Sequence, residues 1–220
     1  MMSEWWTYRL SDLLLFAPAT YYRLFELAHA DLWPAQPLAL ALGAACWLLA
    51  WRGTAMHLRT MLVLLALAWA TVAGGFLWRH YASIHWGASW MAAAFGVQAV
   101  LLAAHAVAWP RHARPAATAR NLGLTLAAAG LAWPLLAPLL GRPWTQAEPF
   151  ALMPDPTAVA TLGLLLALPR RAPALWPLPL AWCAVTGATL WTMGSPEAWA
   201  APGAAVLAVA ALAIRRWRVT

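Results

Sequence analysis

The sequence contains no lysine, and charged residues make up only 10% of its 220 positions, whereas 64% are hydrophobic. A soluble domain carries about 25% charged residues, so the composition argues against a soluble globular protein. Without lysine the chain cannot form a retinal-type Schiff base, which requires a lysine amine. The two cysteines, Cys46 and Cys183, each stand alone in an apolar run and indicate no disulfide framework.

Catalytic motifs are also missing. The sequence has no nucleophile elbow, HExxH motif, P-loop or paired-carboxylate pattern, so it does not identify an enzyme, and it indicates no particular cofactor. The net charge of +7 does not indicate a nucleic-acid partner, because the arginines lie in short segments between apolar stretches. Arginines in such segments orient membrane proteins, and we expect the lipid bilayer to be the main partner.

Apolar stretches dominate the chain, and a stretch of about 20 residues crosses a bilayer as a helix. The sequence therefore predicts an all-α, polytopic membrane protein with a bundle of seven transmembrane helices. The predicted spans are 35–51, 58–78, 86–109, 120–141, 156–169, 174–193 and 198–214. Prolines within or beside them predict kinks at Pro134, Pro138, Pro177 and Pro179.

The charges between these spans alternate in a way that supports the count. One side carries ten arginines and no acid: Arg52, Arg59, Arg111, Arg114, Arg120, Arg170, Arg171, Arg215, Arg216 and Arg218. The other side carries every acidic residue, with four arginines: Glu4, Asp12, Glu26, Asp31, Glu148, Asp155, Glu197, Arg9, Arg23, Arg79 and Arg142. The positive-inside rule then predicts an outer N-terminus and a cytoplasmic C-terminus.

Residues 1–34 form an N-terminal segment ahead of the transmembrane domain, 35–220. A helix is predicted over 20–32, with an apolar stripe of Tyr21, Leu24, Phe25 and Ala28. We interpret it as an amphipathic interfacial helix on the outer membrane surface. A plug over the mouth of the bundle is the alternative.

The richest polar segment covers 141–161 and contains Gln146, Glu148, Asp155 and Thr157. Asp155 followed by Pro156 predicts the N-cap and first turn of a helix. A loop lying on the interface, followed by an ordinary cap, is the preferred interpretation of this segment. The alternative is that the apolar residues 150–153 dip into the membrane first, which makes the fifth span a broken helix next to an ion site.

Histidines form a second polar group. His80 and His85 lie on the outer side and are candidates for metal binding or proton relay, although ordinary hydrogen bonds to loop carbonyls explain them better. Gln98 and His105 lie seven residues apart on one face of the third span, where polar side chains mark a pathway or an interhelical hydrogen bond. Whether any metal is bound is left open.

Seventeen tryptophans are more than the predicted interfaces require. Trp47, Trp69, Trp90 and Trp182 fall inside spans. Aromatic packing within the bundle explains them best, and a chromophore or quinone pocket is the alternative.

Several motifs resemble a family of small bacterial multi-pass inner-membrane proteins of unknown function. They are FxPxTYYRLFELxxAxxWPAQ (16–36), YASIHWGA (81–88) with Gln98 downstream, GRPWTQAE (141–148), PDPTAVATLG (154–163) and LAWC…GATLW (180–191). The resemblance implies a bacterial inner-membrane location and no particular activity.

These features predict a transporter or channel for a small solute or ion, with a polar outer vestibule. The residues expected to bind the substrate or ion are Gln146, Glu148, Asp155, Thr157, His80, His85, Gln98 and His105. The alternative is a membrane subunit that binds a redox cofactor or quinone, or that scaffolds a larger complex. Self-association into a homo-oligomer is also left open.

Overall fold

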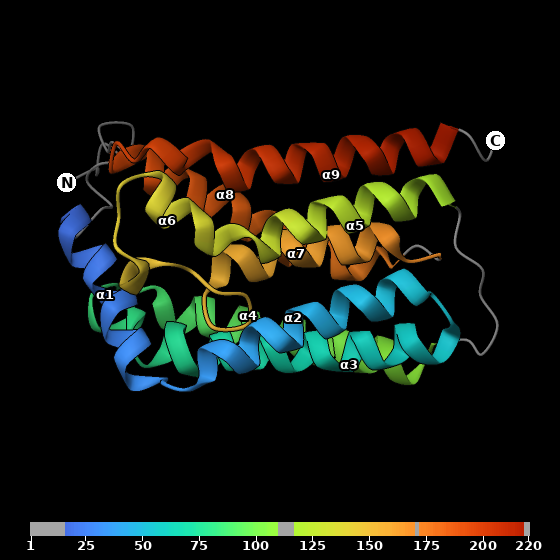
Figure 1. The fold of residues 1–220 in the computed structure, drawn as a ribbon, viewed down its shortest axis with the longest axis horizontal. Coiled ribbons are helices and arrows are strands. Elements are labelled where there is room, and N and C mark those ends of the chain that lie inside the picture. The colour runs from blue at the N-terminus through green and yellow to red at the C-terminus, as the bar shows by residue number, and fades with distance from the viewer. Residues whose placement is uncertain (1–15, 110–116, 170–171, 218–220) are drawn as a thin grey trace, which may run out of the picture.

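The computed structural model describes residues 16–109, 117–169 and 172–217 (Figure 1). The described residues are helices joined by short connections, which confirms the all-α class. The α-helices are α1 (Pro18–Asp31), α2 (Ala35–Arg52), α3 (Ala55–Thr71), α4 (Ala88–Val107), α5 (Ala117–Leu131), α6 (Leu136–Leu139), α7 (Pro154–Ala167), α8 (Pro177–Thr192) and α9 (Ala200–Trp217). Shorter helical pieces lie between them: η3 (Val72–Trp78, a π-helix), η4 (Tyr81–Ser83), η5 (Trp133–Leu135), η6 (Trp144–Gln146), η7 (Pro173–Leu175) and η8 (Pro196–Trp199).

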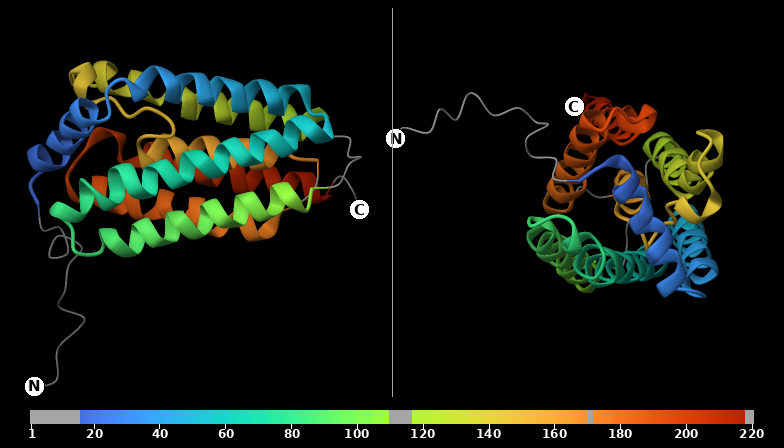
Figure 2. Two further views of the ribbon diagram at one scale, coloured as in Figure 1. Left: turned by 90° about the horizontal axis from the view of Figure 1, so that it is seen from below. Right: turned by 90° about the vertical axis from the view of Figure 1, so that its left-hand side faces the viewer.

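Helix α7 is the centre of the bundle. All of its residues, Pro154–Ala167, are buried, and the longer helices run along it (Figure 2, right). Its composition suits this position, because Asp155 is its only charged residue and most of the others are apolar. A helix that is apolar on every side is one that the rest of a protein surrounds.

Two local signals set helix boundaries inside the bundle. Gly53 ends α2 in the left-handed conformation (φ 67°), and the side chain of Thr54 accepts a hydrogen bond from the His57 amide to begin α3. Pro134 lies at the break between α5 and the η5–α6 turn, where the axis bends by 45°. The predicted kinks at Pro177 and Pro179 are wrong, because both residues lie in the first turn of α8, where the missing amide of a proline is tolerated.

Small residues bring α5 and α7 into direct backbone contact. A Cβ atom at Gly123 would lie 2.5 Å from the Gly163 carbonyl oxygen, and one at Gly130 would lie 2.6 Å from the Ala160 amide nitrogen. A Cβ atom at Gly163 would lie 2.3 Å from the amide nitrogen of Ala127. Close approach over small residues is typical of helix pairs in membranes.

Helix α1 crosses the end of the bundle in front of α7 (Figure 2, right). The predicted stripe of Tyr21, Leu24, Phe25 and Ala28 is confirmed, and all four residues are buried. The stripe packs on protein, with Phe25 stacked on Phe76 at 5.4 Å. Protein therefore covers the stripe, which is not free to lie on lipid.

The predicted spans each contain a helix, but not all are long. Three helical stretches are long and apolar enough to cross a membrane: Ala55–Ser83, Ala88–Val107 and Pro196–Ile214. The number rises to five if two bent pairs, α1 with α2 and the residues 120–131 with 133–139, each count as one span. Helices α7 and α8, with 14 and 16 residues, are shorter than this.

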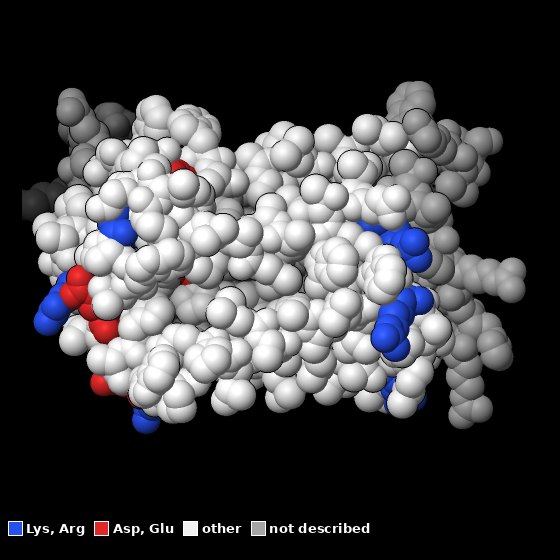
Figure 3. Space-filling view, viewed as in Figure 1, with Lys and Arg blue, Asp and Glu red and all other residues white. Residues whose placement is uncertain are grey.

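The two ends of the bundle differ in charge. Figure 3 shows acidic side chains only at the end where α1 lies, with some arginines among them, while the opposite end of this face carries arginine alone. The acids that the structure describes are Glu26, Asp31, Glu148, Asp155 and Glu197. We call the end covered by α1 the acidic end.

Candidate functional site at the acidic end

The connection before α7 is buried, although it has no regular structure. Every residue from Ala147 to Met153 is buried, and the chain passes inward from the acidic end before α7 begins (Figure 1). Ala151 has a positive φ of 64°, which is uncommon for a residue with a side chain. Such backbone conformations persist only where the surrounding structure enforces them.

Hydrogen bonds hold this buried loop in place. The Ala151 amide donates to the Thr157 hydroxyl at 2.9 Å, and the Thr71 hydroxyl donates to the Ala151 carbonyl at 2.6 Å. His29 of α1 donates from Nε2 to the Ala147 carbonyl at 2.7 Å. Thr157, a predicted binding residue, therefore fastens the loop to α7.

Asp155 lies in the first turn of α7 and is not its N-cap. The cap position is Met153, and no side chain caps the helix there. The Asp155 carboxylate instead accepts hydrogen bonds from Trp182 Nε1 at 2.7 Å and from the Thr186 hydroxyl at 2.8 Å, both from α8. The Asp155 side chain therefore bonds to a neighbouring helix instead of capping its own.

Glu148 is the most unusual group in the loop. Only 6% of the residue is exposed, and its Oε2 atom is buried without a hydrogen-bond partner within the described part of the chain. The Asp155 carboxylate and the Arg142 guanidinium both lie close enough to Glu148 to interact with it electrostatically. A buried carboxyl group of this kind takes up a proton or a cation readily.

Arg142 connects this loop to η8 and α1. Its Nη2 atom lies 2.9 Å from Oε1 of Glu197, and its guanidinium lies over the Tyr22 ring at 4.4 Å. The Tyr22 hydroxyl donates to Glu197 at 2.8 Å and contacts the Ser195 hydroxyl at the same distance. The sequence indicates Arg142 and Glu197 only as charges in outer loops. It does not reveal their pairing, because more than fifty residues separate them.

The remaining residues predicted to form the vestibule each bond to a separate partner. Gln146 lies at the acidic end, where its amide donates to Glu26 of α1 at 2.8 Å. His80 lies 3.6 Å from Asp31, while Nδ1 of His85 accepts a hydrogen bond from the Gly87 amide at 3.0 Å. The histidines thus have loop partners of their own, and the described residues contain no group of three or more His, Cys, Asp or Glu that could hold a metal ion.

Gln98 and His105 lie apart from this cluster. The Gln98 amide is fully buried and donates to the Leu175 carbonyl at 2.9 Å, which is the expected interhelical hydrogen bond. His105 bonds to the Leu101 carbonyl one turn earlier on its own helix at 2.9 Å, so an interhelical bond is wrong for it. Neither residue adds to the acidic cluster.

Three of the four internal tryptophans use their indole nitrogens within the bundle. Trp47 donates to the Leu124 carbonyl, Trp69 to the Thr161 hydroxyl and Trp182 to Asp155. Trp69 and Trp182 also flank Phe95, with ring centroids 4.2 and 5.0 Å away. These contacts agree with aromatic packing.

A narrow cavity of about 10 Å³ lies beside Trp182 and Thr186, the two hydrogen-bond donors to Asp155, and its size suits about one water molecule. Tyr21 and Phe76 line it together with Tyr81 from η4. Pro154, Trp182 and Thr186 complete the wall beside Asp155, with Val185 and Thr189.

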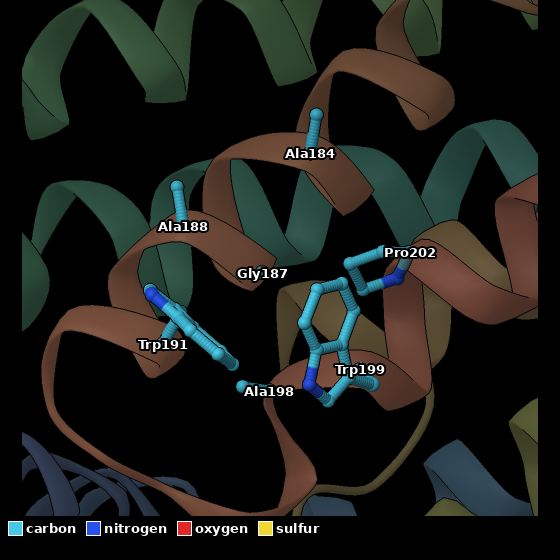
Figure 4. Close-up of a pocket in the computed structure, with 7 residues that line it drawn as sticks. All are labelled: Ala184, Gly187, Ala188, Trp191, Ala198, Trp199 and Pro202. Atoms are coloured by element: carbon cyan, nitrogen blue, oxygen red, sulfur yellow. The ribbon is translucent and has the colours of Figure 1, made fainter.

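Larger hollows lie on the sides of the bundle and are apolar. One of about 270 Å³ lies between α8 and α9, where the rings of Trp191 and Trp199 flank it beside Gly187 and Pro202 (Figure 4). Another of about 400 Å³ is lined by α5, α7 and α9, with Thr125 as its only polar residue. None of the predicted binding residues lines either hollow, so the buried carboxylates mark the candidate site.

Comparisons with other proteins supply no activity. A sequence model of DUF6064, described as a family of unknown function, matches residues 19–220. No curated protein and no solved structure matches the chain.

Proposed function

The chain belongs to DUF6064, a family of unknown function, and from the geometry of the acidic end we propose that it is a membrane transporter or channel for a small cation. The observation that carries this proposal is the buried pair of carboxylates, Glu148 and Asp155. They lie where an irregular buried loop turns into the central helix α7.

The outer surface of the bundle supports insertion in a membrane. Large apolar side chains are exposed along several helices, including Val100, Leu139, Val206 and Leu207. Exposed apolar side chains in such numbers have no favourable place in water. We propose that all seven predicted ranges cross or enter the bilayer, with the acidic end outside and the arginine end in the cytoplasm of a bacterial inner membrane.

A broken span accounts for the short central helix. The 14 residues of α7 extend about 21 Å, less than the roughly 30 Å of hydrocarbon in a bilayer. The buried loop 147–153 supplies the remaining depth. Irregular backbone at membrane depth is tolerated where protein surrounds it, and transporters place ion sites at such breaks.

The charge balance of the cluster favours a cation. Glu148, Asp155 and Glu197 interact electrostatically with one another and with a single guanidinium, that of Arg142. When all four are ionised, negative groups outnumber positive ones in a buried place. The amino end of α7 stabilises the Asp155 carboxylate through its dipole, whereas Oε2 of Glu148 is buried without a donor among the described residues.

Flux measurements in proteoliposomes test the proposal. Purified protein is reconstituted, and movement of Na⁺, K⁺, NH₄⁺ and H⁺ is followed for the wild type and for Glu148→Gln and Asp155→Asn. We expect at least one ion to move and both variants to slow it by about tenfold or more, since each removes a charge that binds it. Asp31→Asn is the control, because this acid ends α1 with a side chain that is 67% exposed and should leave flux unchanged.

Unchanged flux in both carboxylate variants, or no movement of any of the four ions, would contradict the proposal. Size-exclusion profiles of the same samples show that each variant is folded.

A further inference from the structure

The cavity beside Asp155 limits what can reach the carboxylates. Its volume of about 10 Å³ accommodates one water molecule and no hydrated metal cation. Thr186, one of its lining residues, is also a hydrogen-bond donor to Asp155 at 2.8 Å. The cavity is therefore one side chain away from the buried carboxylate.

The lining of the cavity is poor in ligands for a bare metal cation. Dehydrated Ca²⁺ takes six to eight oxygen ligands, whereas most of this wall is aromatic or aliphatic. Of its threonines, Thr186 donates its hydroxyl proton to Asp155 and Thr189 donates to the Val185 carbonyl. A water molecule, which needs only two to four polar partners, suits the cavity better.

Two phenols in this wall are free to bond with such a water. Tyr21 from α1 and Tyr81 from η4 are both buried, and their ring centroids are 6.2 Å apart. Neither hydroxyl has a hydrogen-bond partner among the residues that the structure describes. Tyr21 lies close enough to both Asp155 and Glu148 to interact with them electrostatically, so it borders the cavity and the carboxylate pair at once.

From this arrangement we infer that the transported or coupling cation is a proton, which passes from the outer face through the water-sized cavity to Asp155 and Glu148. A tyrosine hydroxyl both donates and accepts hydrogen bonds, so Tyr21 and Tyr81 link the cavity water to the carboxylates. The inference rests on the proposed function and specifies its ion. The titratable groups around the pair are Arg142 and Glu197, Tyr21 and Tyr22 of α1, Tyr81 of η4, and Cys183 of α8.

The test is proton uptake by proteoliposomes that contain a pH-sensitive dye, driven by a potassium diffusion potential. Tyr21→Phe and Tyr81→Phe keep the rings and remove the hydroxyls that line the cavity. We expect each to slow proton uptake by about tenfold, and Glu148→Gln and Asp155→Asn to slow it at least as much. Thr192→Val is the control for the removal of a hydroxyl, because Thr192 lies on α8, donates to the Ala188 carbonyl and does not line the cavity.

The outcomes separate this inference from the proposed function. Carboxylate-dependent flux of Na⁺, K⁺ or NH₄⁺ without proton uptake would overturn the proton assignment and leave the transporter proposal intact. Proton uptake that is lost in the carboxylate variants but equal in Tyr21→Phe, Tyr81→Phe and wild type would overturn the route through the cavity. No carboxylate-dependent flux of any ion would overturn both proposals.

Discussion

At the scale of single residues, Glu148 and Asp155 differ in how their carboxylates are held. Asp155 accepts hydrogen bonds from Trp182 and Thr186, whereas Oε2 of Glu148 is buried without a hydrogen-bond partner among the described residues.

The indole nitrogen of Trp182 donates a hydrogen bond to Asp155, and substitution of Trp182 tests the value of this bond. Trp182→Phe keeps an aromatic ring beside Phe95 and removes the donor to Oδ1 of Asp155. We predict a loss of about 1–3 kcal/mol in unfolding free energy, the cost of leaving a buried acceptor unpaired. Trp199→Phe, at an exposed position, should change it by less than about 0.5 kcal/mol, and equal effects of the two substitutions would contradict the assignment.

The sequence identified the carboxylates but not their partners. Glu148 and Asp155 stood out because acids are rare in an apolar chain. Trp182 and Thr186 lie 27 and 31 residues beyond Asp155, and no local spacing reveals a contact between separate helices. The histidines are not part of the carboxylate cluster. His80 lies beside Asp31, and His85 accepts a hydrogen bond from the Gly87 amide.

At the scale of elements, the contact between α5 and α7 fixes the position of the central helix. We predict that Gly163→Ala destabilises the protein by about 1–3 kcal/mol, because the new methyl group meets the Ala127 backbone, which cannot move aside. Gly96→Ala in α4 meets nothing within 4 Å and should be neutral or stabilising by up to about 1 kcal/mol. Thermal unfolding of the pair checks this, and equal Tm values for the two variants would contradict it.

Helix positions were largely predictable from apolar periodicity and from proline and glycine. The stripe on α1 was predicted residue by residue, yet the sequence could not decide whether lipid or protein covers it. The glycines of α5 and α7 carried no distinct signal, because an alanine-rich chain has small residues everywhere. The close contact becomes visible only once both helices are placed.

At the scale of the whole molecule, the acidic end and the arginine end define the proposed orientation. The outer access to Glu148 and Asp155 depends on a bundle that crosses the bilayer with the acidic end outside. The native thiols do not interfere with a labelling test of this arrangement, because Cys46 and Cys183 are both buried. Trp144, 61% exposed at the acidic end, and the exposed Arg52 at the end of α2 provide one labelling position at each end.

The most direct test is therefore the labelling of Trp144→Cys and Arg52→Cys with a membrane-impermeant maleimide in intact cells. We predict that the cysteine at position 144 reacts at once and the one at position 52 reacts only after the membrane is permeabilised. The reverse pattern, or equal labelling of both positions in intact cells, would contradict the orientation and with it the outer access to Glu148 and Asp155.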